Sequence, residues 1–381
     1  MEQVQEHPLV PPREANGRYS GLGRLSDFFI DYAMRERTFL ALLGFGFLLV
    51  GVTYEHAAIA RWVGFLFASY AAVGNDSIQT IGTFIASNGK KPWWALWLFM
   101  GAIFLATVLY SWLAHDGDVS YQRLAAKGFE TAPASFSYLQ VAAPLFLLIL
   151  TRFRMPVSTT FLLLTSFTTS AGSVGKVLSK SVSGYALAFA VAFGVWIVLS
   201  KVLERWTKGT EPHPLWRIGQ WIISGVLWAV WLMQDAANIA VYLPRSLSLL
   251  EFIAFAGVIV AGLGLLFYMR GERVQQVVTE KTNVVDVRSA TIIDAVYAVI
   301  LFYFKMHSKM PMSTTWVFIG LLGGRELAIS LRRAGPYSVK HAVKLMAKDV
   351  FFVAIGLLVS VIIATAVNDG FRSAVLGMFG L

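Results

Sequence analysis

Long apolar runs alternate with short polar segments along most of the chain. Runs that approach or exceed the roughly 20 residues needed to cross a hydrocarbon core cover 39–54, 93–114, 182–203, 247–269 and 349–367. Two other pairs of apolar segments are each joined by a polar tip, and they cover 133–151 with 156–175 and 288–306 with 312–328. This pattern predicts an all-α integral membrane protein with several spans.

Composition supports this class. Hydrophobic residues make up 56% of the chain, charged residues make up 14%, and the mean hydropathy is +0.62. A water-soluble globule of this composition would expose large apolar patches, so a lipid bilayer is the expected environment. The net charge of +10 does not indicate a nucleic-acid partner, because the basic residues lie mainly between apolar runs, where membrane topology explains them. The absence of cysteine excludes disulfides, thiolate metal sites and cysteine nucleophiles.

The distribution of Lys and Arg assigns a side to each loop. If the two tip-joined pairs are re-entrant helical hairpins that enter and leave on one side, 21 of the 32 Lys and Arg residues share the face of the amino terminus, and 7 lie on the other. Because cytoplasmic loops are rich in Lys and Arg, residues 1–38 are predicted to be a cytoplasmic segment of a plasma (inner) membrane protein. The loops would lie on the same sides if all four hairpin arms crossed the membrane, so the charge distribution does not by itself predict re-entrance. That prediction rests on the polar tips.

The chain also divides into two units with the same order of elements. After an additional span at 39–58, each unit has a broken span, a full span, a re-entrant hairpin and a closing span. The units cover 59–203 and 217–367, a cytoplasmic linker at 204–216 joins them, and 368–381 forms a C-terminal tail. Each unit crosses three times, so the second repeat is inverted relative to the first. Inverted repeats place their binding site near the mid-plane, where interrupted helices meet.

Both predicted hairpin tips carry the same short motif, MPVSTT at 155–160 (the first tip) and MPMSTT at 310–315 (the second tip). Pro is tolerated in the first turn of a helix, so each tip predicts a helix start whose free N–H groups and hydroxyls bind an anion. A single copy would be read as an ordinary helix cap, and the matched pair favours a site. Arg154 and Lys309, which precede the motifs, are candidate approach residues. The expected anion-binding residues are Ser158, Thr159, Thr160, Ser313, Thr314 and Thr315.

Each predicted broken span carries a carboxylate flanked by two side-chain amides. These clusters are Asn75, Asp76 and Gln79 in the first unit and Gln234, Asp235 and Asn238 in the second. Acidic residues inside a membrane usually belong to functional sites, and oxygen ligands suit a hard cation, so sodium or a proton is expected at Asp76 and Asp235. Two helix ends supply roughly one positive charge, less than a doubly charged oxyanion needs, and bound cations would complete the neutralisation.

These motifs, GNDSIQTIGT at 74–83, MPVSTT, QDAAN at 234–238 and MPMSTT, resemble the repeats of the inorganic phosphate transporter family over nearly all of 59–367. The resemblance implies an inverted-repeat carrier, usually a homodimer, that needs no cofactor and moves phosphate with sodium or protons. Some members move sulfate. When the family motifs are matched to this sequence, the resemblance implies that the two amide-flanked Asp clusters bind the cation and that the two Ser-Thr-Thr runs bind the anion. Gln79 and Gln234 stand where the family usually has Asn, and Ile239 replaces a Gly, so the coupling ion and the substrate stay open.

Other functions were weighed from the same residues. An enzyme is not expected, because none of the six His is followed by Glu, and neither a Gly-x-Ser-x-Gly nor a P-loop motif occurs. Three alternatives to a coupled phosphate carrier stay open: a permease for sulfate or another tetraoxyanion, an uncoupled anion channel, and a substrate sensor. Asp294 has no counterpart in the other half, and structural and functional roles stay equally open for it.

Overall fold

The computed structural model describes residues 34, 36–126, 128–153, 155, 157–168, 171–207, 209–269, 286–307, 309, 311–332 and 338–378. Every regular element in this part of the chain is a helix. In order these are α2 (Arg37–Thr53), α3 (Ala57–Ser87), α4 (Trp93–Ala114), η1 (Arg123–Ala125), α5 (Tyr138–Arg152), α6 (Thr159–Leu162), η2 (Leu164–Phe167), α7 (Ala171–Thr207), α8 (Leu215–Ala240), α9 (Leu249–Tyr268), α11 (Val287–His307), α12 (Thr314–Leu331), α13 (Val339–Val367) and α14 (Asp369–Met378).

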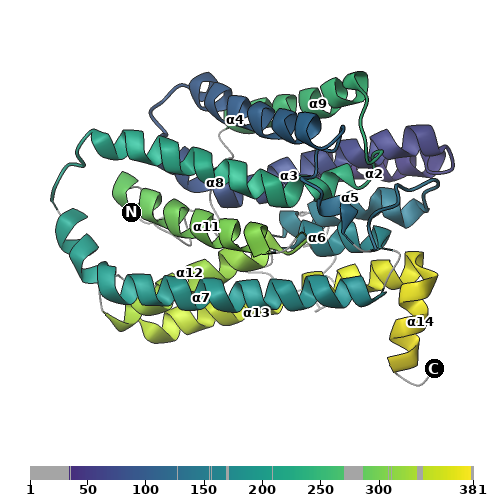
Figure 1. Cartoon of the computed structure of the whole chain (residues 1–381). Helices are drawn as coiled ribbons and strands as arrows, with labels where there is room; N and C mark the ends of the chain where they lie inside the picture. Colours follow the sequence, from purple (N-terminus) through teal and green to yellow (C-terminus); the bar gives the residue numbers. More distant parts are fainter. Residues whose placement is uncertain are drawn as a thin grey trace.

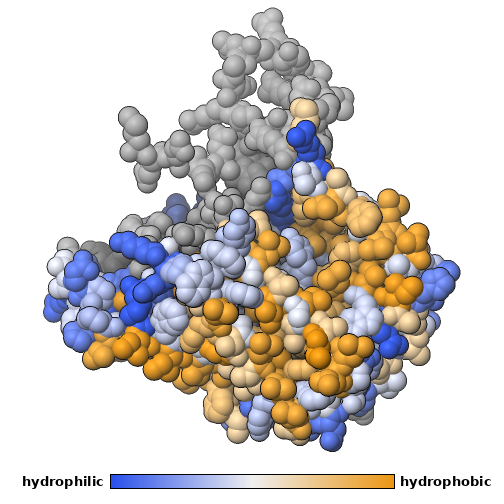
Figure 2. Space-filling view, turned by 90° about the horizontal axis from the view of Figure 1, so that it is seen from above, coloured by the Kyte–Doolittle hydropathy of each residue, from blue (hydrophilic) through white to orange (hydrophobic). Residues whose placement is uncertain are grey.

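Seven of the described helices are long and apolar enough to cross a membrane: α3, α4, α7, α8, α9, α11 and α13. By length and composition they indicate an integral membrane protein, which confirms the predicted class. A broad apolar area crosses the face shown in Figure 2, and hydrophilic residues gather toward the ends of that face. α2 covers most of the predicted additional span, but its 17 residues reach only about 26 Å at 1.5 Å per residue. Most of the predicted segment 1–38 lies outside the described residues.

The prediction that two spans are interrupted is wrong. α3 is a continuous helix of 31 residues that includes the polar stretch 74–83, and α8 runs unbroken over 26 residues, with 234–238 in its last turns. A helix keeps its own backbone hydrogen bonds whatever its side chains are, and here the polar side chains find partners on other elements. Polarity therefore marks a tertiary contact in these helices and not an interruption.

The two predicted hairpins differ in length. α5 has 15 residues and is followed by the first tip and the short elements α6 and η2. α11 has 21 residues and belongs to the seven helices long enough to cross, and α12, with 18, follows the second tip. In each hairpin the second arm turns back against the first, since α5 contacts α6 and α11 contacts α12.

The helix packing in one half of the chain is repeated by the corresponding helices of the other half. α3 packs against α5 as α8 packs against α11, and α9 packs against α3 as α4 packs against α8. α6 lies on α13 as α12 lies on α7. In Figure 1, α4 and α9 form the top of the molecule and α7, α12 and α13 the bottom, with α5, α6 and α11 between them. The arrangement brings both tips to the middle of the fold.

Glycine permits the closest of these contacts, between α7 and α12. A Cβ at Gly320 would overlap the backbone carbonyl of Tyr185, and one at Gly324 would overlap that of Phe189. Small residues allow helix backbones to approach in this way in membrane proteins. The α7–α12 contact positions the second tip, because α12 begins there.

Candidate functional site

At the second tip, helix α12 is capped and tied to an acidic residue. Ser313 is the N-cap and its side-chain oxygen accepts a hydrogen bond from Trp316 N (3.2 Å). The backbone N–H of Ser313 donates to Ser181 Oγ on α7 (2.8 Å). The hydroxyl of Thr314 donates to Asp235 Oδ2 on α8 (2.5 Å). The tip is thereby joined to one of the two predicted carboxylates.

The first tip repeats this arrangement. Ser158 caps α6 by accepting from Phe161 N (3.3 Å), and the hydroxyl of Thr159 donates to Asp76 Oδ2 on α3 (2.5 Å). Asn75 Nδ2 donates to Asp76 Oδ1 (2.7 Å) and to the carbonyl of Val157 (3.3 Å). In both tips the helix begins at the first Thr of the motif, so the Ser is a cap residue. Pro311 lies outside the helix, which corrects its expected place in the first turn, and Pro156 lies outside the described residues.

The two tips contact each other directly. Thr160 Oγ1 donates to the carbonyl of Met312 (3.1 Å), and Thr315 Oγ1 donates to the carbonyl of Val157 (3.5 Å). Asn238 Nδ2, from the second acidic cluster, donates to Thr159 Oγ1 of the first tip (3.1 Å). The predicted anion-binding and cation-binding residues whose side chains are described are at most 6% exposed. One enclosed polar site therefore contains both tips and both acidic clusters.

Among the described residues, two amide oxygens of the second cluster have no hydrogen-bond partner. Gln234 Oε1 and Asn238 Oδ1 are buried and unpaired, whereas their amide nitrogens donate to the carbonyl of Leu301 (2.9 Å) and to Asp235 Oδ1 (2.6 Å). Buried polar atoms are normally paired. Amide and carboxylate oxygens are the ligands that a hard cation prefers. In the first cluster, the side chain of Gln79 lies outside the described residues.

The two carboxylates also interact through space. Asp76 and Asp235 are close enough to repel each other, although they come from different halves of the chain. A cation bound beside either one would reduce this repulsion, which is a second reason to expect positive charge here.

Arg123 belongs to this site and was missed by the sequence reasoning. It lies in η1, is 2% exposed, and its Nε donates to the carbonyl of Met233 (3.3 Å). Burial lowers the pKa of Arg123 to about 10, and the nearby carboxylate of Asp235 opposes that change, so the guanidinium stays charged at neutral pH. Lys180 and Lys305 are close enough to Arg123 to repel it. A single Arg in a loop gives no sequence signal for such a position.

Of the two predicted approach residues, the structure describes Lys309 alone. Arg154 lies outside the described residues. Lys309 is exposed, and its ammonium donates to the side chain of Gln122 in the loop before η1. Arg152, near the first tip, pairs with Glu36.

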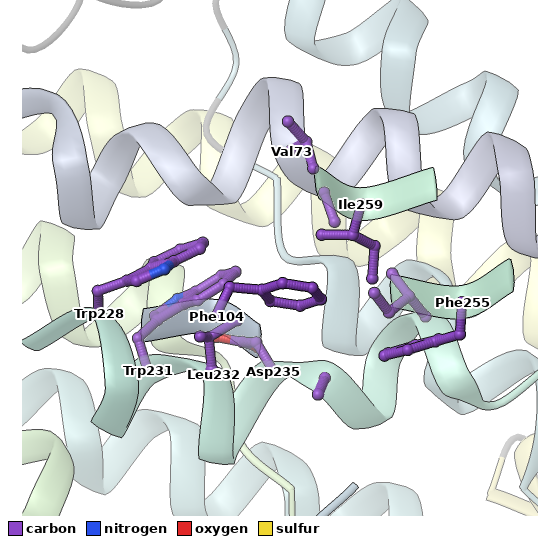
Figure 3. A pocket seen from close by; sticks show the side chains of 11 residues that line it. Val73, Phe104, Trp228, Trp231, Leu232, Asp235, Phe255 and Ile259 are labelled. Carbon is purple, nitrogen blue, oxygen red and sulfur yellow. The ribbon is translucent and has the colours of Figure 1, made fainter. Parts of the chain in front are cut away.

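A small cavity is lined in part by Asp235. It has a volume of about 20 Å³ and is lined mainly by apolar and aromatic side chains, among them Phe104, Trp231 and Ile259 (Figure 3). Roughly 10–15 Å³ of such volume holds one water molecule, so this space has room for about one water and is too small for an oxyanion. The indole N–H of Trp231 is buried without a hydrogen-bond partner.

Comparison with models of protein families, with curated proteins and with solved structures finds no match. Within the described residues, no three His, Cys, Asp or Glu side chains group into a metal site. The ligand set proposed for a cation accordingly consists of amide and hydroxyl oxygens around single carboxylates.

Proposed function

We propose that this chain is a secondary carrier that moves inorganic phosphate across a membrane together with sodium or protons, as its resemblance to the inorganic phosphate transporter family implies. The observation that carries the proposal is the pair of bonds from Thr159 to Asp76 and from Thr314 to Asp235. They join one expected anion ligand in each tip to the expected cation ligand of the same half.

These bonds supply a mechanism for coupling. A hydroxyl that donates to a carboxylate cannot donate the same hydrogen to an anion. A cation that binds Asp76 or Asp235 competes for the carboxylate oxygens and releases the threonine hydroxyl, whose hydrogen then turns toward phosphate. Binding of either ion thereby favours binding of the other, and this linkage is reciprocal.

The anion would lie between the tips, against Thr159, Thr160, Thr314 and Thr315. α12 has 18 residues and its N-terminal dipole favours negative charge. α6 has only four residues, so the first tip contributes hydroxyls and N–H groups more than a dipole. The charged guanidinium of Arg123 adds fixed positive charge near Asp235. Cations at both carboxylates would complete the neutralisation of a dianion.

Alternating access would follow from the two-fold arrangement. The repeated contacts of the two halves are those expected of inverted repeats, with α5–α6 and α11–α12 as re-entrant hairpins. The enclosed site corresponds to an occluded state, from which rocking of one set of helices would open a path to either side. We place the amino terminus in the cytoplasm of a plasma (inner) membrane on the Lys and Arg distribution.

Uptake by reconstituted protein tests this function. Proteoliposomes are given labelled phosphate under a sodium gradient at equal pH, or under a proton gradient without sodium, with sulfate as competitor. Saturable, concentrative uptake under at least one gradient is the expected result. Flux that ignores both gradients would instead identify a channel, and phosphate binding without flux would identify a sensor. Preferential uptake of sulfate would change the substrate.

A further inference from the structure

Helix α13 carries one continuous exposed stripe along most of its length. The members of this stripe recur every three or four residues, and they are Lys340, Lys344, Lys348, Phe351, Ala354, Leu358 and Ile362. Residues at this spacing share one face of a helix. The opposite face contains the buried residues Ala342, Gly356 and Ser360, and α13 contacts α12 and α6. α13 therefore packs against the protein on one face and is open along the other.

The exposed stripe changes from apolar to basic at Phe351. Phe351, Leu358 and Ile362 are 61%, 60% and 58% exposed. Because α13 is long and apolar enough to cross a membrane, this part of the stripe faces lipid chains. The three lysines continue the same face for about two more turns. We call Lys340, Lys344 and Lys348 the lysine row.

The lysine row begins where the hydrocarbon core ends. Lys348 and Lys344 lie about 5 and 10 Å beyond Phe351 along the helix axis, and the polar layer on each side of the core is about 5–8 Å thick. Lys side chains bend toward such a layer while their stems cover apolar surface. Lys348 shows this arrangement, with its Nζ 5.6 Å from the centre of the Phe352 ring. The ammonium groups of the row can therefore reach lipid phosphates.

The protein does not neutralise the charge of the lysine row. Within the residues that the structure describes, none of the three lysines pairs with a carboxylate. Asp349, the one acidic residue in the sequence of α13, is half-buried on the packed side of the helix. Like charges four residues apart on a helix repel each other. An anion bound from outside would reduce this repulsion.

The chemistry of the whole stripe favours a phospholipid as that anion. A free oxyanion would contact the lysine row alone, whereas an anionic lipid also places its chains along Phe351 and Leu358. A second copy of the chain is disfavoured, because a two-fold contact brings identical surfaces together and would set the lysine row against itself. The net negative charge of the headgroup distinguishes this lipid from a zwitterionic one.

We propose that the lysine row of α13 binds the phosphate groups of anionic phospholipids, whose chains lie along Phe351 and Leu358. The Lys and Arg distribution places the row at the cytoplasmic leaflet. α13 also contacts the first tip, since a Cβ at Gly356 would lie 3.3 Å from Val157 Cγ1. The bound lipids hold the helix on which this tip rests. The site goes beyond the proposed function, because it requires only that the chain spans a membrane.

Lipid titration of the purified, delipidated protein in neutral detergent tests the site by native mass spectrometry. Phosphatidylglycerol and phosphatidylcholine with the same chains are compared. The wild type should bind phosphatidylglycerol at least tenfold more tightly. Replacing Lys340, Lys344 and Lys348 together by Gln should reduce this preference to within twofold, and replacing all three by Arg should preserve it. If the Gln variant does not fold, Lys344→Gln alone should reduce the preference at least threefold.

The matched control removes three other exposed lysines from loops and helix ends assigned to the same face, by Lys90→Gln, Lys91→Gln and Lys201→Gln together. It should keep the wild-type preference, and an equal loss in both triple variants would replace the site by general surface charge. An unchanged preference in the folded lysine-row variant would overturn the proposal. So would displacement of the lipid by inorganic phosphate but not by chloride at equal ionic strength, which would indicate a free-anion site. A dimer that is lost in the lysine-row variant would instead assign the row to a second copy of the chain.

Discussion

Thr314→Val tests the coupling mechanism most sharply. The Thr314 hydroxyl is 1% exposed and donates to Asp235 Oδ2 at 2.5 Å. Val has nearly the same shape as Thr, so the change removes a donor without opening a cavity. The variant loses the hydroxyl hydrogen that, in the proposed mechanism, turns from the carboxylate of Asp235 toward phosphate.

A hydrogen bond to a charged group contributes about 1.5–3 kcal/mol, and each 1.4 kcal/mol is about a tenfold change in affinity. The KM for phosphate should therefore rise roughly 10- to 100-fold. The increase in phosphate affinity with cation concentration should also weaken, because only Thr159 would still connect anion and cation sites. Thr314→Ser keeps the hydroxyl and should restore most of both properties.

The assay is initial uptake of labelled phosphate by proteoliposomes, measured at several sodium or proton concentrations. Thr107→Val is the matched control, since Thr107 is a buried hydroxyl that donates to the backbone of its own helix at Ile103 (2.7 Å). A Thr314→Val protein with KM within twofold of the wild type and unchanged cation dependence would refute the mechanism.

Three further predictions follow from the same contacts. Gln234→Leu removes a buried amide oxygen that has no hydrogen-bond partner among the described residues, next to Asp235 in the sequence. It should raise the half-saturating cation concentration about tenfold, by loss of one charged-group interaction, and an unchanged cation titration would remove Gln234 from the ligand set. Arg123→Gln removes fixed positive charge and should raise the KM for phosphate, and Arg123→Lys should restore part of the affinity. Equal KM values for the wild type and both variants would show that this charge does not contribute to phosphate binding. Gly324→Ala places a Cβ against the carbonyl of Phe189 and should lower the melting temperature of the purified protein. Gly257→Ala, whose Cβ would meet open space, should leave the melting temperature unchanged. Equal melting temperatures for the two variants would contradict the close approach of α7 and α12.

The sequence predicts most of the fold because the bilayer constrains it so strongly. Long apolar runs must be helices in lipid, and the structure confirms the all-helical class. The helix starts at the tips could be located from Ser158 and Ser313, because Ser caps a helix through local hydrogen bonds. The polar stretches 74–83 and 234–238 could be recognised as unusual, but their effect on the helix could not, because it depends on partners that lie far away in sequence.

Arg123 and Asp294 show what sequence patterns leave out. Both are single residues with no matching copy in the other half, and their importance lies in the elements that fold around them. Arg123 reaches the site because η1 packs against α8, and Asp294 gains its partners from α3 and α8. Periodicity cannot predict such contacts. The pairing of each tip with the carboxylate of its own half was more accessible, because the motifs occur twice in the same order.

Phosphate binding to purified protein, with and without cation, decides whether the tips and the carboxylates act as one site. The titrations compare the wild type with Asp76→Asn and Asp235→Asn, after circular dichroism confirms that each is folded. Phosphate should bind the wild type at least tenfold more tightly in saturating cation than without it, and both variants should lose this increase. Equal, cation-dependent phosphate affinity in all three proteins would contradict a shared site.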